Sequence, residues 1–414
     1  LRKKIIQMMD NTTNKGFSSL FLIAVVFYIW HTTIPALGYK TPAVLFAGCI
    51  LFLYAYIFVK NRIISNSVGS ILPILGLYFL ELVYSGTSNF AIKIYQILQM
   101  GLYPLLILYI AKYGNERLVR FLFWAVIVSY VFTAITTYAG CIMYPGAART
   151  LALPEEEMGA NIFAMYKMAN IGNLTFTYSL VLLIPQLIFL IKSRIVKRLQ
   201  SITMLVVLVI TILETEYTTA LLLMTICFSL FFIPVHITKK HIWGLITVAG
   251  IIFIFSKLFI GDLLIGVSSS VGSETMAARL NDLGMILKNG MKSADEGDVG
   301  SRMELYNMSI QSFLKSPLLG GIKSIGGHSL FFDSLGRFGL LGLAAFVISY
   351  KKIWSEFYKP FSVTPYYGYL LFSFILVVVM AFFNPKDNLS VVTFTIPLFT
   401  LFYNQQYESS LDRQ

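Results

Sequence analysis

Charged residues are scarce in this chain: they make up 13% of its 414 residues, whereas apolar residues make up 57%. The mean hydropathy is +0.74. A soluble domain of this length would not bury that much apolar surface, which excludes an ordinary globular protein. The apolar runs also lack the alternating pattern of a transmembrane β-barrel. The sequence therefore predicts an all-α integral membrane protein, because a backbone in hydrocarbon must satisfy its hydrogen bonds internally.

Cysteine is almost absent, and the chain has no internal repeat, heptad array or low-complexity tract. Cys49, Cys141 and Cys227 fall in apolar runs at unrelated spacings, which excludes a disulfide framework and a cysteine metal site. The acidic stretch at 295–298 is a weak alternative for metal binding.

Apolar runs of about 20 residues recur along the chain and predict about 12 transmembrane helices. They lie at 17–35, 42–59, 69–84, 92–111, 121–143, 171–191, 200–213, 217–235, 242–260, 328–349, 365–383 and 389–404. The least regular are the short runs at 69–84 and 200–213. Residues 1–414 are expected to form a single polytopic membrane domain with one large external loop at 261–327.

Lysine and arginine are distributed unequally between alternate loops. One side holds Arg2, Lys3, Lys4, Lys15, Lys60, Arg62, Lys112, Arg117, Arg120, Lys192, Arg194, Lys197, Arg198, Lys239, Lys240, Lys351, Lys352 and Lys359, and the short loops opposite offer little beyond Lys40, Lys93 and Lys386. The basic side is predicted to be cytoplasmic, with both ends of the sequence inside and segments 144–170 and 261–327 outside. The basic residues of this side account for most of the excess of positive charge, which is +12 over the chain. They would contact anionic lipid headgroups at the membrane surface. The net charge therefore gives no reason to expect a nucleic-acid partner.

The external segment 261–327 contains a predicted amphipathic helix near 302–315. Ser301 and Glu304 fit a capping box with Ser301 as N-cap. An apolar face follows at helical spacing, made by Met303, Tyr306, Ile310, Phe313 and Leu314. The apolar face is expected to rest on the bilayer interface or on the spans below. Ser309, Ser312 and Lys315 are expected on or near the other face. Pro317 with Gly320 and Gly321 ends the helix.

Arginines of the two external segments are candidate phosphate ligands. Arg302 in the first helical turn would oppose the helix dipole, which disfavours a purely stabilising role. Beside free backbone N–H groups it would suit a phosphate group instead. The alternative is a solvated arginine paired with a loop carboxylate. Arg149, in the segment that also holds Lys167 and the acidic run 155–157, is a second candidate.

His328 follows two glycines and opens the span at 328–349. An imidazole near its ordinary pKa suits proton abstraction from a sugar hydroxyl, although an interfacial histidine can also be purely structural. His31, at another outer span end, is expected to be dispensable. Asp333 and Arg337 have the spacing of a helical ion pair inside the span. Glu214 and Glu216 interrupt an apolar stretch, near the outer face.

Two of these segments resemble a known family. The pattern R-x-x-x-x-x-x-S-I from Arg302, the S-P-L-x-G turn at 316–320 and H-S-x-x-x-D-x-L-x-R-x-G-L-x-G from His328 to Gly342 are similar to signatures of the O-antigen polymerase and O-antigen ligase superfamily. The resemblance covers about 40 residues and agrees with the predicted topology. It implies a metal-independent membrane glycosyltransferase of the C-type fold, with no cofactor and an undecaprenyl diphosphate-linked donor.

The resemblance also implies site residues, which match His328 as the catalytic residue and Arg302 as a diphosphate ligand. Many members carry an arginine in the polar break of the middle spans, where this chain has Glu214-Thr215-Glu216-Tyr217. Arg149, Arg279 or Arg337 would have to replace it. Asp333, Glu304 and Tyr306 are expected to support the site.

A polysaccharide polymerase of an O-antigen (lipopolysaccharide) or capsule pathway, in the bacterial plasma membrane with its site facing outward, is the favoured interpretation. An O-antigen ligase is the alternative, and a lipid-linked sugar flippase is a further one, which would favour short loops and repeated halves. The expected partners are undecaprenyl diphosphate-linked oligosaccharides, membrane lipids and a chain-length regulator.

Overall fold

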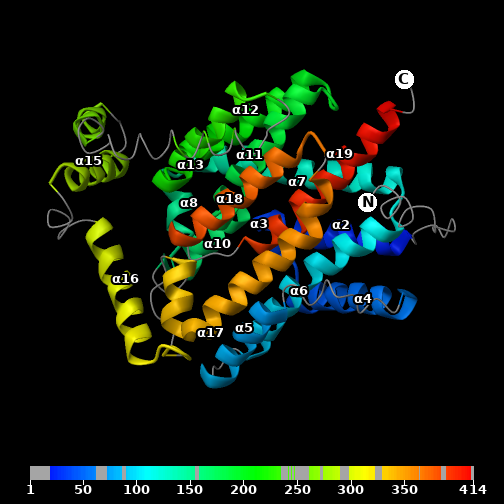
Figure 1. The fold of residues 1–414 in the computed structure, drawn as a ribbon, viewed down its shortest axis with the longest axis horizontal. Helices are drawn as coiled ribbons and strands as arrows, with labels where there is room; N and C mark the ends of the chain where they lie inside the picture. Colours follow the sequence, from blue (N-terminus) through cyan, green and yellow to red (C-terminus); the bar gives the residue numbers. More distant parts are fainter. Residues whose placement is uncertain are drawn as a thin grey trace. The chain divides into compact units, whose positions relative to one another are not determined.

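The computed structural model describes residues 19–61, 72–85, 90–153, 158–234, 241, 244, 247, 261–270, 274–289, 298–321, 329–362, 364–383 and 388–411. Every regular element within these ranges is a helix (Figure 1). The predicted all-helical class is therefore confirmed for the described part of the chain.

Helices lie at eleven of the twelve predicted spans, and the run at 242–260 falls almost wholly outside the described residues. They are α2 (Ser19–Thr33), α4 (Ala43–Asn61), α5 (Leu72–Ser85), α6 (Phe90–Tyr113), α7 (Glu116–Met143), α11 (Leu174–Ser193), α12 (Arg198–Glu214), α13 (Thr218–Phe228), α17 (Leu330–Ile353), α18 (Tyr367–Phe383) and α19 (Ile396–Leu411). Short helices η2 (Ser229–Phe232), η4 (Trp354–Tyr358), η5 (Lys359–Phe361) and η6 (Val391–Thr395) adjoin them.

Four helical segments of the described chain are long and apolar enough to cross a membrane: Ile94–Tyr113, Glu116–Met143, Leu174–Ser193 and Leu330–Phe361. Shorter apolar helices cover Ser19–Thr33, Ala43–Phe58, Thr218–Phe232 and Tyr367–Phe383. These helices are consistent with a helical membrane protein. The number of spans stays a prediction.

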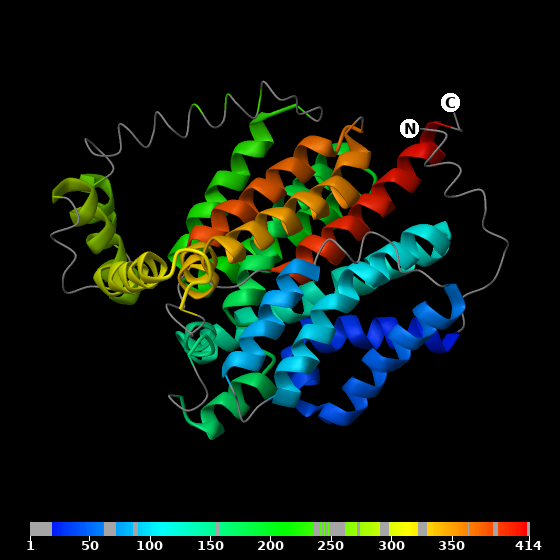
Figure 2. The same cartoon turned by 60° about the horizontal axis from the view of Figure 1, so that its bottom comes forward.

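The chain divides into two compact units. Unit 1 comprises Leu1–Val235, Ala345–Val377 and Asn388–Gln414, and unit 2 comprises His236–Ala344 and Val378–Asp387. In unit 1, α7 packs against α2, α12 and α19, while α11 packs against α12, α13 and α19 (Figure 2). Every residue of α11 from Phe176 to Ile191 is buried. A helix that is apolar all round belongs at the centre of such a bundle.

Hydrogen bonds between helices add to the packing of unit 1. The Tyr403 hydroxyl donates to the Gln186 carbonyl at 3.2 Å, and the Gln186 amide donates to Ser373 Oγ at 3.1 Å. Thr211 Oγ1 donates to the Ala134 carbonyl at 3.0 Å, which joins α12 to α7. Lipid gives apolar helices little reason to associate, so close packing and such polar links must hold a membrane bundle together.

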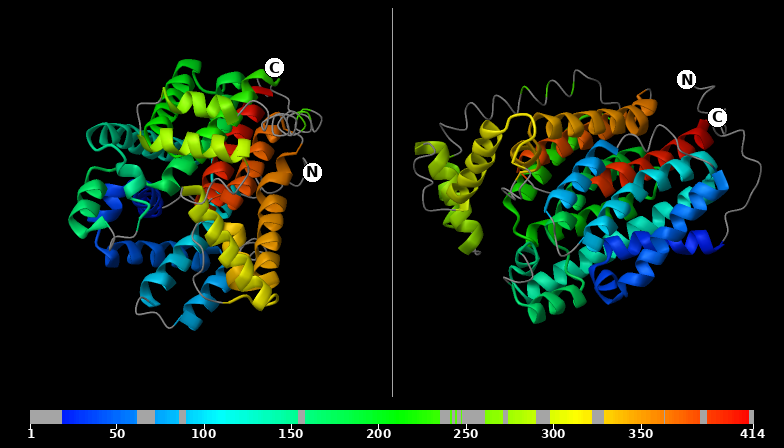
Figure 3. Two further views of the ribbon diagram at one scale, coloured as in Figure 1. Left: turned by 90° about the vertical axis from the view of Figure 1, so that its left-hand side faces the viewer. Right: turned by 90° about the horizontal axis from the view of Figure 1, so that it is seen from below.

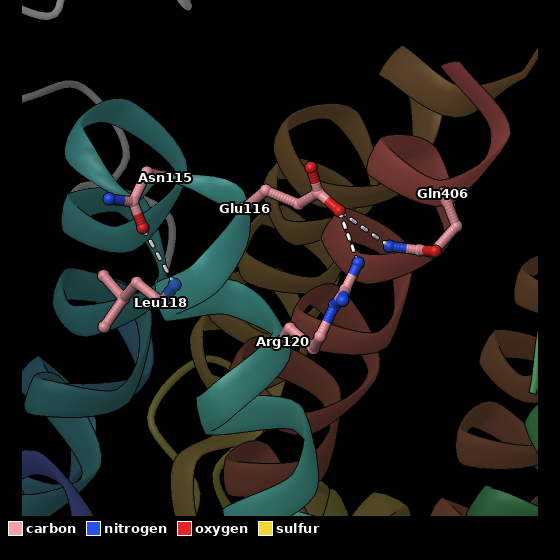
Figure 4. Close-up of polar contacts among 5 residues, drawn as sticks. All are labelled: Asn115, Glu116, Leu118, Arg120 and Gln406. Carbon is pink, nitrogen blue, oxygen red and sulfur yellow. Dashed lines mark hydrogen bonds and ion pairs between the residues drawn. The ribbon is translucent and has the colours of Figure 1, made fainter. Parts of the chain in front are cut away.

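The N-terminal end of α7, on the side predicted to be cytoplasmic, is fixed by two polar residues (Figure 4). Asn115 caps the helix, because its side-chain oxygen accepts a hydrogen bond from the Leu118 N–H at 2.9 Å. Glu116 Oε1 accepts from Arg120 at 2.6 Å and from the Gln406 amide at 3.2 Å. An exposed ion pair contributes little by itself. The same carboxylate nevertheless joins α7 to α19.

Unit 2 contains a helical segment over 261–268, then α15 (Glu274–Asn289), α16 (Asp298–Lys315) and the first part of α17. Helices α15 and α16 are neighbours (Figure 3). Gly284 of α15 lies against the segment 261–268, since a Cβ there would lie 2.7 Å from the Gly261 carbonyl oxygen. An exposed ion pair between Lys288 and Asp262, at 2.6 Å, joins the same two elements.

The charge asymmetry predicts opposite sides for two exposed serines, Ser269 of unit 2 and Ser355 of unit 1. Each is changed to cysteine in a background in which Cys49, Cys141 and Cys227 are alanine. In right-side-out vesicles, a membrane-impermeant maleimide should label Ser269→Cys at once and Ser355→Cys only after permeabilisation. Immediate labelling of Ser355→Cys, with Ser269→Cys protected, would invert the predicted topology.

Candidate functional site

Helix α16 begins at Asp298, three residues before the predicted N-cap at Ser301. The capping-box prediction for Ser301 and Glu304 is therefore wrong. Glu304 is an exposed residue of the second turn. The four N–H groups without a helical partner belong to residues 298–301, so the dipole argument for Arg302 in the first turn also fails. Its charge keeps it a candidate phosphate ligand.

The face of α16 that packs on α17 carries the serines. Ser309 is fully buried, and Ser312 Oγ donates to the Gly336 carbonyl at 2.9 Å. By contrast, Ile310 and Leu314 of the predicted apolar face are exposed by 38% and 67%, which is consistent with the bilayer-interface alternative for these two residues. This face of α16 carries small side chains because the backbone of α17 lies very close to it at Gly336. A Cβ on Gly336 would lie 2.8 Å from the Ser309 carbonyl oxygen.

The two sequence segments that carry the family resemblance meet backbone to backbone within unit 2. The Leu340 N–H donates to the Pro317 carbonyl at 2.8 Å, and the Gly321 N–H donates to the Gly336 carbonyl at 2.9 Å. Gly320 has φ +66°, and a Cβ on it would lie 2.4 Å from the Arg337 carbonyl carbon. The S-P-L-x-G turn and the R-x-G-L part of the later motif are thus one folded element.

Helix α17 is broken at Gly339, which the prediction of a continuous span at 328–349 did not include. Gly339 has φ 59° and ψ −150°, a conformation open almost only to glycine. A Cβ there would also lie 2.5 Å from the Pro317 carbonyl oxygen. The break frees the Leu340 N–H from regular helix geometry for its bond to Pro317.

Asp333 is 6% exposed and accepts hydrogen bonds from Ser309 Oγ at 3.5 Å and from the Ser329 N–H at 3.4 Å. Ser329 Oγ in turn accepts from the Phe332 N–H at 3.2 Å, so Ser329 caps α17. Tyr306 of α16 stacks on Phe332, with ring centroids 5.0 Å apart. Asp333 and Tyr306 therefore support the junction of α16 and α17. The predicted pairing of Asp333 with Arg337 stays a prediction.

Several predicted site residues cannot be placed. His328, the acidic runs 155–157 and 295–297, and the side chains of Arg279 and Arg302 lie outside the described residues. Their roles stay predictions.

Arg149 is next in the chain to Ala148, which contacts the last residue of the polar break at 214–217, Tyr217, within unit 1. It belongs to α8 (Ala147–Thr150) and is half-buried. The Tyr217 hydroxyl donates to the carbonyl of the preceding residue, Ala148, at 2.7 Å. Glu214 ends α12, and Glu216 has φ 55° in the following turn. The segment 144–170 and the break at 214–217, both predicted to lie at the outer side, are therefore in contact.

Unit 1 also encloses a cavity of about 650 Å³. Its wall comes from the ends of α2, α6 and α11 that the charge distribution predicts to be external, from the middle of α7, from α3 (Pro35–Lys40) and α10 (Ala160–Met168), and from residues 390–395. Amide, phenol and hydroxyl side chains line it, including Gln96, Gln99, Asn173, Tyr39, Tyr103 and Ser390. Sequence reasoning missed this site, although Gln96 and Gln99 in an apolar span were a usable signal.

Lys167 and His31 are the basic residues among the described residues that line the cavity, and none of those residues is acidic. The Lys167 ammonium lies 5.4 Å from the centre of the Phe163 ring. Burial lowers the pKa of its amino group below the ordinary value. The His31 ring stacks on Phe46, with centroids 3.4 Å apart. The expectation that His31 is dispensable stays a prediction, and His31 forms part of the cavity wall.

Asn170, which precedes α11 with φ 59°, links the short helices α3 and α10 of the cavity wall to α7. Asn170 Oδ1 accepts from the Ala36 N–H at 3.1 Å, and its amide donates to Thr136 Oγ1 at 2.7 Å. The Gly172 N–H donates to Thr137 Oγ1 at 2.8 Å. Helices α3 and α10, which pack on each other, are thereby tied to α7.

No protein-family model matches this sequence, and neither does any curated protein sequence.

The junction of α16 and α17 predicts a sharp difference between two glycines of unit 2. Gly339→Ala meets both a disallowed φ and the Pro317 carbonyl, whereas Gly266→Ala is the matched control, with no neighbour within 4 Å. Gly339→Ala should lower the free energy of unfolding of unit 2 by about 1–3 kcal/mol or more. Limited proteolysis of purified protein measures this as faster cleavage within 261–344. Equal cleavage rates for the two variants would contradict the junction.

Proposed function

We propose that this chain is a membrane polysaccharide polymerase. It joins undecaprenyl diphosphate-linked oligosaccharide repeat units on the outer face of the bacterial plasma membrane, in an O-antigen or capsule pathway. The carrier lipid, neighbouring membrane lipids and a chain-length regulator are its proposed partners. No metal or other cofactor takes part in the proposed reaction.

The observation that carries this proposal is the direct contact between the two resembling segments. They are separate in the sequence, at 302–320 and 328–342, yet their backbones bond to each other through Pro317, Gly321, Gly336 and Leu340. The contact supports reading them as one motif, and the resemblance then suggests the chemistry.

In the proposed reaction, a hydroxyl of the acceptor repeat unit attacks the anomeric carbon that joins the growing glycan to its carrier. The new C–O bond forms as the bond to the diphosphate oxygen breaks, and undecaprenyl diphosphate leaves with that electron pair. His328 accepts the hydroxyl proton. Cationic side chains stabilise the departing diphosphate, because that is where negative charge develops. Arg302, Arg279 and Arg337 of unit 2 are candidates for this role.

Arg149 is the candidate best supported as a substitute for the arginine expected in the polar break. Its helix α8 touches Tyr217 of that break directly. A guanidinium suits a diphosphate because its planar donors make bidentate contacts.

The decisive variant for catalysis is His328→Ala, with His241→Ala, on the predicted cytoplasmic side, as the matched control. Loss of a general base costs on the order of 10²–10⁴ in rate. Purified His328→Ala protein should therefore convert lipid-linked repeat unit to almost no long polymer on a gel. His241→Ala should give the wild-type ladder. A normal ladder from His328→Ala, at matched protein amounts, would remove the residue from the mechanism.

Arg149 gives an independent test of diphosphate binding. Arg149→Lys keeps the charge but loses the bidentate fork, so it should remain clearly impaired. Arg149→Ala should be impaired more strongly. Arg198→Ala, an exposed arginine at the predicted inner end of α12, should be neutral. Initial polymerisation rates over a range of substrate concentrations measure the difference, and wild-type rates for Arg149→Ala would refute the role.

A further inference from the structure

The cavity of unit 1 has the size and the chemistry of a small-ligand site. Its volume of about 650 Å³ lies within the roughly 300–1,000 Å³ of typical ligand pockets. Polar side chains are costly in a membrane bundle and gather where they serve a ligand or one another. Here amides, phenols and hydroxyls converge from five helices and the segment 390–395.

The hydroxyls of the wall are well placed to accept hydrogen bonds from a polyol. Thr32 Oγ1 and Thr33 Oγ1 donate to the Ile29 carbonyl at 2.9 and 2.6 Å, and Ser179 Oγ donates to the Thr175 carbonyl at 2.8 Å. A hydroxyl that donates its hydrogen bond to a carbonyl of its own helix can still accept hydrogen bonds through its lone pairs. A ligand rich in O–H donors would match these oxygens.

An aromatic surface accompanies the polar groups. Tyr39 lines the cavity and is 47% exposed. A phenol ring combines an apolar face with a polar hydroxyl, so it can cover the C–H face of a sugar ring. The wall therefore favours a saccharide over a purely apolar ligand.

The charge of the cavity wall indicates that the ligand is an anion. Lys167 is a cation in the cavity wall, and the described lining contains no carboxylate; among the described residues its ammonium lies 5.4 Å from the centre of the Phe163 ring. A partly desolvated ammonium without an anionic partner is unfavourable, and a bound anion would offset that cost.

We infer that this cavity binds a saccharide that bears a carboxylate, with the carboxylate paired to Lys167. The inference rests on the proposed function for its saccharide ligand, and it assigns the repeat units to the class of acidic glycans. Lys167 is a binding residue in this site and takes no part in bond breaking.

The test is binding of small probes to the purified full-length protein in detergent, by saturation-transfer NMR. Methyl glucuronide should bind about tenfold more tightly than methyl glucoside, which differs from it by the carboxylate. Lys167→Gln should remove that preference and leave glucoside binding unchanged. Lys40→Gln, which removes an exposed lysine at the end of α3 outside the cavity lining, should bind both probes like the wild type. Tyr39→Ala should weaken both.

Three results would overturn the inference. The first is equal binding of glucuronide and glucoside, as expected if Lys167 instead pairs with the acidic run 155–157. The second is an unchanged preference in Lys167→Gln protein whose thermal unfolding matches wild type. The third is Lys167-dependent binding of inorganic pyrophosphate, followed by ³¹P NMR, without any saccharide response.

The binding assay needs no turnover, so its outcome is separable from that of the polymerase proposal. If the wild-type protein binds glucuronide but does not polymerise repeat units, the cavity site is supported and the proposed polymerase reaction is refuted. A polymer ladder from a protein that shows no carboxylate preference would refute the cavity site alone.

Discussion

The organisation of unit 2 depends on one close backbone contact, between the turn that ends α16 and the break in α17. Three N–H groups of the junction, those of Gly321, Leu340 and Leu341, donate to carbonyls across it. Such proximity requires glycine at Gly320, Gly336 and Gly339, where a Cβ would lie 2.4 to 2.8 Å from backbone atoms of the opposite segment. The buried Asp333 and the serines of α16 fill the space beside it. Because three positions must be glycine, few other arrangements of α16 against α17 are compatible with this contact.

Unit 1 follows a different principle, in which polar side chains link apolar helices and gather around one cavity. Tyr403, Gln186 and Ser373 join helices in the interior. Nearer the predicted outer end, Asn170 ties the short helices α3 and α10 to the bundle and keeps a polar cavity beneath them. The lysine-rich and arginine-rich ends lie on the opposite side, where Glu116 links α7 to α19.

The helices were predictable from the sequence because an apolar run of about 20 residues has few alternatives in a bilayer. Even the short runs at 69–84 and 200–213 are helical, as α5 and α12. The orientation of α16 was not predictable from its own periodicity. Its packing face is decided by Gly336, which lies 24 residues after Ser312. The break at Gly339 likewise depends on Pro317.

The cavity escaped sequence reasoning for the same physical reason. Its wall draws on residues from Ile29 to Thr395, and only packing brings such distant positions together. Lys167 and His31 could be named from the sequence, but nothing local indicates that they face one space. Arg149 was a candidate from its loop, and its proximity to the polar break emerged only through the bond between Tyr217 and Ala148.

The most direct test of the proposed activity is the product stoichiometry of the wild-type protein in proteoliposomes supplied with one lipid-linked repeat unit. A polymerase should release one undecaprenyl diphosphate for each glycosidic bond formed, and mass spectrometry should show carrier-linked glycans at integer multiples of the repeat. Transfer of a single glycan to a different acceptor would favour a ligase. Movement of intact substrate across the bilayer, with no new bond and no free undecaprenyl diphosphate, would contradict polymerisation outright.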